Sequence, residues 1–145
     1  MEKELIEKEL LKLRYPDQRV LDINIMDLGS TTKLAAETFI IEFYHCSFIK
    51  IDNDLMNFEN IQQFKNGNTG LFLQNISVDN VTIQSRTGVS NNIVKCGYAY
   101  AHGKRFEIMC TMMDIVIECL DFKIIKKSDL ERNIESLIHY KEKDQ

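Results

Sequence analysis

Hydrophobic and polar residues alternate along several stretches of the chain, and this period of two is typical of strands with one buried face. The alternation predicts four strands, at residues 19–28, 38–51, 71–83 and 113–125, the last of which is one strand or two. Two further runs of strand-like composition, residues 92–101 and 104–110, flank His102 and Gly103. They predict a hairpin in which the glycine supplies the positive φ of a tight turn.

Two of these strands change the face that carries their large apolar side chains. In residues 39–43 these side chains share one parity, whereas Cys46 and Phe48, which follow His45, take the other. The same change occurs midway through residues 71–83. Such a switch is typical of a β-bulge or of a bend between sheets, so we expect a strongly bent antiparallel sheet, either a sandwich or a half-barrel.

Helical periodicity is found near both ends of the chain. In residues 2–14 three apolar side chains recur at i, i+4 and i+7, and Pro16 ends that helix. The sequence Ser-Asp-Leu-Glu at residues 128–131 has the spacing of a capping box and precedes a second amphipathic stretch. We therefore predict a single α+β domain over residues 1–145, with an N-terminal and a C-terminal helix.

Composition and charge narrow the choice of partner and compartment. The chain has 145 residues, a formal net charge of −4 and a pI near 5.4, without a cluster of Lys and Arg. This balance argues against nucleic acid or an anionic membrane as partner and is compatible with a basic protein. The amphipathic start is not a secretory signal, and no apolar run approaches the ~20 residues of a membrane span. We expect a cytoplasmic protein.

The residues that carry most enzyme chemistry are absent or weakly patterned. The four cysteines lie in apolar runs without a C-x-x-C pair, and no phosphate loop, dinucleotide fingerprint or zinc spacing is present, so we predict neither cofactor nor metal. A small enzyme that uses His45 as a general base beside Asp52 and Asp54 remains an alternative. Another is a small-ligand-binding β-domain with an apolar pocket inside the bent sheet.

The predicted hairpin has one face that favours recognition of a protein. If the turn consists of His102 and Gly103, then Tyr100 lies opposite Arg105 and Tyr98 lies opposite Glu107. Tyrosine and arginine are enriched at protein interfaces. This pattern predicts a partner-binding face, although an ordinary exposed sheet face would show the same residues.

An acidic, amide-rich stretch follows the second strand. Residues 51–60 contain Asp52, Asp54 and Glu59. Carboxylates in a loop can dock on a basic surface and speed association. We add these three residues to the candidate partner-binding set, and a solvated loop is the alternative.

The order of these features resembles that of a class of small bacterial proteins. The segments FYHCSFIKID, ISVDNVTIQ and AYAHGKRFEIMC follow one another along the chain. They resemble immunity proteins of polymorphic-toxin and contact-dependent-inhibition systems, several families of which end in a Gly-x-x-Phe-x-Ile strand, here Gly103, Phe106 and Ile108. The resemblance implies a non-enzymatic protein that binds and neutralises a toxin domain, such as a basic nuclease.

Overall fold

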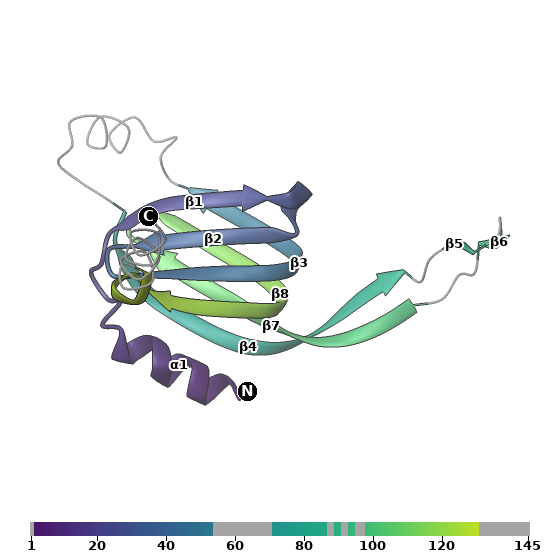
Figure 1. Cartoon of the computed structure of the whole chain (residues 1–145), viewed down its shortest axis with the longest axis horizontal. Coiled ribbons are helices and arrows are strands. Elements are labelled where there is room, and N and C mark those ends of the chain that lie inside the picture. Colours follow the sequence, from purple (N-terminus) through teal and green to yellow (C-terminus); the bar gives the residue numbers. More distant parts are fainter. Residues whose placement is uncertain (1, 54–70, 87–88, 91–92, 95–97, 131–145) are drawn as a thin grey trace, which may run out of the picture.

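The computed structural model describes residues 2–53, 71–86, 89–90, 93–94 and 98–130 (Figure 1). Its elements are α1 (Lys3–Lys12), β1 (Val20–Met26), the 3-10 turn η1 (Asp27–Gly29), β2 (Thr31–Ala36), β3 (Phe39–Asn53), β4 (Leu73–Arg86), β5 (Val89–Ser90), β6 (Ile93–Val94), β7 (Tyr98–Cys110) and β8 (Met113–Lys126). Six strands form one antiparallel sheet in the order β1-β2-β3-β8-β7-β4, and β5 pairs with β6. The ends of β4 and β7 continue beyond the other strands as a two-stranded ribbon.

The sheet is strongly bent, as predicted, but it is not closed. Its two edge strands approach one another at the isolated bridge between Arg19 and Phe72. There the Val20 amide donates to the Leu71 carbonyl at 2.7 Å, and Leu73 exchanges backbone hydrogen bonds of 2.8 Å with Gln18 and Asp17, the residues that precede β1. The described strands do not form a second packed sheet, so the sandwich alternative is not confirmed.

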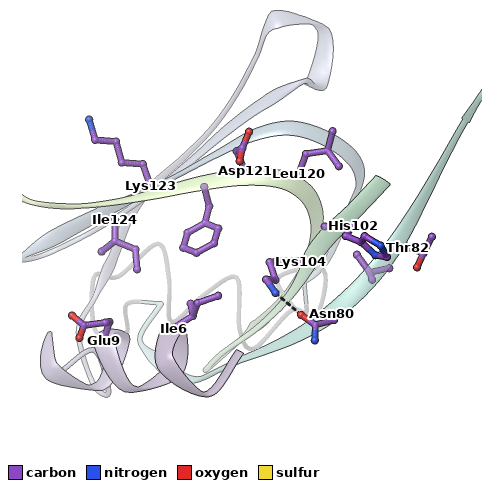
Figure 2. Close-up of a pocket in the computed structure, with 13 residues that line it drawn as sticks. Ile6, Glu9, Asn80, Thr82, His102, Lys104, Leu120, Asp121, Lys123 and Ile124 are labelled. Atoms are coloured by element: carbon purple, nitrogen blue, oxygen red, sulfur yellow. Dashed lines mark hydrogen bonds between the residues drawn. The ribbon is translucent and has the colours of Figure 1, made fainter. Parts of the chain in front are cut away.

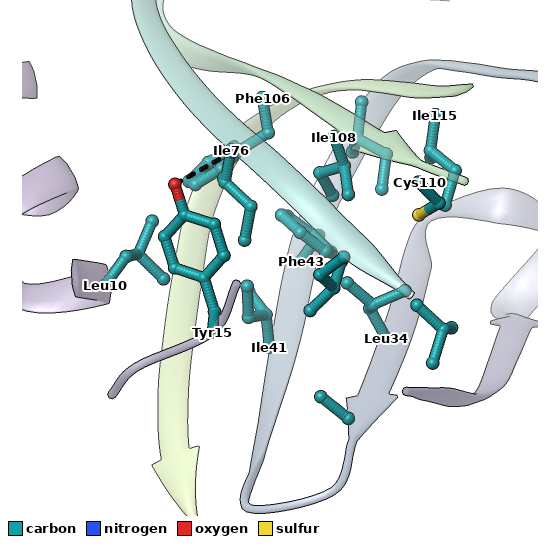
Figure 3. Packing of buried hydrophobic residues seen from close by; sticks show 14 of the residues in the cluster. Leu10, Tyr15, Leu34, Ile41, Phe43, Ile76, Phe106, Ile108, Cys110 and Ile115 are labelled. Atoms are coloured by element: carbon teal, nitrogen blue, oxygen red, sulfur yellow. Dashed lines mark hydrogen bonds between the residues drawn. The ribbon is translucent and has the colours of Figure 1, made fainter. Parts of the chain in front are cut away.

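The hydrophobic core lies on the concave side of this sheet (Figure 3). The Phe43 and Phe106 rings meet edge to face with centroids 5.0 Å apart, although β3 and β7 are separated by β8. Such a pair contributes about 0.5–1.5 kcal/mol beyond its buried area. Helix α1 closes one end of the core with Ile6 and Leu10, both fully buried.

The bend in β3 occurs where the change of parity predicts it. His45 has a left-handed backbone with φ of 53°, and the register with β8 shifts between Cys46 and Phe48. The predicted bulge is therefore confirmed. In β4, burial also changes face between Val78 and Ile83, but the register with β7 is continuous there, so this change comes from twist of the ribbon.

The predicted turn at His102 and Gly103 is wrong, because β7 runs through both residues without interruption. Gly103 serves a different purpose, since a Cβ placed on it would lie 2.5 Å from the Cys119 carbonyl oxygen and 2.6 Å from Cδ1 of Ile83. Its φ is not among the left-handed values. The glycine is needed for the close approach of β7 to β8 rather than for a turn.

Both terminal helices begin near their predicted positions. The N-terminal helix spans Lys3–Lys12, within the predicted residues 2–14. At the other end residues 127–130 are helical, and the rest of the predicted C-terminal helix lies outside the described residues. The short strand β2 was missed by the sequence pattern because only Thr32, Leu34 and Ala36 carry its buried face.

Candidate functional site

The side of the sheet that faces away from the core presents a continuous surface across β3, β8, β7 and β4. In β8 the buried side chains Ile115 and Ile117 alternate with residues that point outward. Cross-strand pairing aligns these outward residues in three rows of four. We call these twelve residues the outer face: Asp79, Arg105, Glu118 and Phe48; Ser77, Glu107, Val116 and Lys50; Asn75, Met109, Asp114 and Asp52.

Arg105 lies in the first row of the outer face, and two carboxylates bind it. Its Nε lies 3.0 Å from Oε1 of Glu107, and its Nη1 lies 3.0 Å from Oε1 of Glu118 on β8. The hydrogen bonds that the guanidinium donates to these two carboxylates raise the pKa of Arg105. The guanidinium therefore orients two acidic side chains on the surface and has less freedom to bind a partner's carboxylate itself.

A second acidic pair lies at the end of the outer face. Asp52 and Asp114 are register partners on β3 and β8, and both are exposed. Directly opposed like charges are destabilising in a sheet. Lys50 offsets part of the repulsion, with its Nζ 3.3 Å from Oδ2 of Asp52. A cation supplied by a partner would relieve the remainder.

The outer face combines excess negative charge with exposed apolar side chains. It carries five carboxylates against two cations, whereas the formal net charge of the whole chain is −4. Phe48 is 43% exposed and Met109 is 48% exposed. Apolar side chains surrounded by charged groups are typical of protein-binding surfaces.

The structure brings together three of the seven residues predicted to bind a partner. Arg105, Glu107 and Asp52 all lie on the outer face. Tyr100 is 67% exposed, but it lies on the projecting ribbon opposite Gln84, so its predicted pairing with Arg105 is wrong.

The side chains of the other three predicted residues are not among those that the structure describes. Tyr98 belongs to β7, but its side chain lies outside the described residues, as do Asp54 and Glu59. The predicted pairing of Tyr98 with Glu107 is wrong as well, because these residues share one continuous strand and Glu107 pairs with Ser77 and Val116.

Sequence reasoning missed most of the outer face, including Glu118, Asp114 and Phe48. The signal was available in residues 113–119, where buried and outward side chains alternate strictly. It was hidden because a strand's pattern identifies its polar face but not the strands beside it. The three rows of the outer face can be recognised only when the order of the four strands in the sheet is known.

The described residues that were considered for an enzyme or a metal site do not lie together in one site. His45 is exposed at the bend of β3, and Asp52 of the same strand pairs with Lys50. Within the described ranges, no group of three or more His, Cys, Asp and Glu side chains could hold a metal ion. The helices of the described part are too short or too polar to cross a membrane.

The thiols that the structure describes are held in their protonated form. Burial raises the pKa of Cys119 to about 12 and that of Cys110 to about 11, with smaller contributions from neighbouring charges. Burial also raises the pKa of Cys46. Because the thiolate is the nucleophilic form, these side chains are suited to packing.

Comparison with models of protein families identifies the family of this chain. The model of a protein family described as "Immunity protein PIM7" matches residues 2–126, which include α1 and all the strands of the sheet. No curated protein matches the chain.

Proposed function

We propose that this chain, which belongs to the PIM7 family of immunity proteins, binds a cognate toxin domain and neutralises it by occupying the toxin's surface. The neutralisation requires no reaction by the immunity protein itself. The family match supports an immunity role, and the outer face supplies a surface suited to a protein. The toxin would come from a polymorphic-toxin or contact-dependent-inhibition system and be met in the bacterial cytoplasm.

The charge of the outer face favours a basic toxin domain, such as a nuclease. Glu118, Asp114 and Asp52 lie on neighbouring strands and create a negative field over one side of the sheet. Complementary charge speeds association and selects among partners, while buried apolar contacts supply most of the affinity. The observation that carries the proposal is therefore the exposure of Phe48 and Met109 within this acidic surface.

The proposal is tested by isolating the partner and then altering the outer face. Tagged protein is recovered from its own cells, and co-purifying proteins are identified by mass spectrometry. A stoichiometric protein that carries a toxin domain is the expected result. Phe48→Ala should weaken its binding by roughly 30-fold, about 2 kcal/mol, with an unchanged circular-dichroism spectrum.

Two further variants separate charge from apolar contact. Asp114→Lys should slow association and reduce its dependence on salt. Leu21→Ala is the matched control, because Leu21 is 53% exposed on β1, away from the outer face. Equal binding by folded Phe48→Ala, Asp114→Lys and Leu21→Ala proteins would exclude the outer face. Absence of any toxin-bearing partner would contradict the proposed function.

A further inference from the structure

A second surface arises where the sheet separates into two parts. Strand β8 pairs with β7 only from Asp114 to Cys119, opposite residues 104–109 of β7. Beyond this point β7 continues with β4 alone, while β8 continues with β3 alone up to Lys126. In the described part of the chain, no strand pairs with residues 120–124 of β8 on the side that β7 has left.

A groove of about 890 Å³ occupies this separation (Figure 2). Five consecutive residues of β8, 120–124, line it together with residues 80–82 of β4 and 102–104 of β7. Ile6 and Glu9 of α1 form the opposite wall. Since successive side chains of a strand point to opposite faces, a lining of five consecutive residues means that the groove follows the backbone edge of β8.

The two sides of this edge differ in chemistry. In Figure 2, Ile124 of β8 and Ile6 of α1 project into the same space, whereas Asp121 and Lys123 point to the other side of the strand. Phe122 also packs against the core from this part of β8. A chain placed along the edge would therefore meet apolar side chains at every second position and charged side chains at the others.

From this geometry we propose that the groove receives an extended segment of the toxin domain, which pairs with residues 120–124 of β8 as an added strand. The inference rests on the proposed function, which supplies a protein as partner. An unpaired strand edge offers N–H and C=O groups in alternation, and a strand satisfies them better than a helix or a small apolar molecule does. The recognised segment would alternate apolar and polar residues over about five positions, or roughly 17 Å.

Hydrogen–deuterium exchange on the complex purified with the tagged chain tests the pairing. Exchange at residues 120–126 is compared between the free protein and the complex. Main-chain hydrogen bonds to an added strand should slow exchange of the edge amides at least about tenfold. Unchanged exchange in this segment, with binding intact, would overturn the inference and leave the proposed function standing.

A pair of variants on α1 tests the groove independently of the outer face. Glu9→Trp would fill the groove from its exposed rim and should weaken toxin binding at least about tenfold, while Glu4→Trp, outside the groove on the same helix, should not. Equal binding by both variants would overturn the inference. Slower exchange at residues 120–126 in the free protein at high concentration would assign the strand to a second copy, and a small molecule retained in native mass spectrometry would assign the groove to a ligand. Either result would also overturn it.

Discussion

Helix α1 lies beside the edges of two strands, β4 and β8, and its contacts with the two edges differ. On β4, the Val78 amide donates to Oε1 of Glu7 at 2.9 Å, and the Ile76 amide donates at 3.2 Å to the hydroxyl of Tyr15, which follows the helix. On β8, α1 stands across a groove and contributes Ile6 and Glu9 to its wall. Within the described residues, side chains satisfy two amides of the β4 edge, whereas no strand pairs with residues 120–124 of β8 on the side of the groove.

The difference shows that edge protection in this fold is local. A free edge invites pairing with other chains, and natural sheets usually cover or interrupt it. Here the burial of Ile6 and Leu10 places α1 close to β4, while the departure of β7 at Gly103 opens the space next to β8. If a toxin segment binds along the β8 edge, then the separation of β7 from β8 next to Gly103 creates its binding site.

The largest expected effect is at the point of separation. Gly103→Val places a side chain where a Cβ would already lie 2.5 Å from the Cys119 carbonyl oxygen, and backbone cannot move aside as a flexible side chain can. We expect the free energy of unfolding, measured by urea titration, to fall by about 3 kcal/mol or more. Gly29→Ala is the matched control, because Gly29 has φ of 94° and open space around it.

The control variant should cost about 1–2 kcal/mol, from backbone strain alone. If the two substitutions lower the free energy of unfolding equally, then the close approach of Gly103 to Cys119 would not be the reason for a glycine at this position.

A smaller effect is expected at the closed edge. Tyr15→Phe removes the acceptor for the buried Ile76 amide, so we expect a loss of about 1–2 kcal/mol in the free energy of unfolding and faster exchange of that amide. Tyr100→Phe is the control, since Tyr100 is 67% exposed, and it should change stability by less than about 0.5 kcal/mol. Similar small changes in both variants would mean that the β4 edge does not depend on the Tyr15 hydroxyl.

The closed and open edges also mark what the sequence could predict. Periodicity located α1, and the change of parity after His45 located the bulge in β3, because both signals are local. Local signals failed at Gly103, since glycine serves tight turns and close packing alike and only the position of Cys119 distinguishes them.

The candidate site followed the same rule. Arg105, Glu107 and Asp52 were chosen from short stretches, and each lies on the outer face. The pairing of Tyr100 with Arg105 depended on a turn that does not exist, and Glu118 joins Arg105 only through the sheet order. The polar face of each strand could therefore be predicted from the sequence. Contacts between strands that are distant in the sequence could not.

A last expected effect, on the pH dependence of stability, concerns the packing of the sheet at the point where β7 leaves β8. Cys119 is the last β8 residue that pairs with β7, and burial raises the pKa of its thiol to about 12. Thiols of an unfolded chain titrate near pH 8.5, so as pH rises from there toward 12 the unfolded chain loses protons that the folded chain keeps. This contribution to stability is present below pH 8.5 and is lost across that window.

Cys119→Ala removes that titration, so its free energy of unfolding should decline less steeply between pH 8.5 and 10.5 than that of the parent protein, when both are measured by urea titration at each pH. The difference between the two slopes cancels the lysine and tyrosine titrations that both proteins share. Parallel profiles would mean that water reaches the Cys119 thiol, and therefore that β7 and β8 are not closely packed at the last residue where they pair. A steeper profile in the parent would show that the Cys119 thiol is shielded from water at the last β8 residue that pairs with β7.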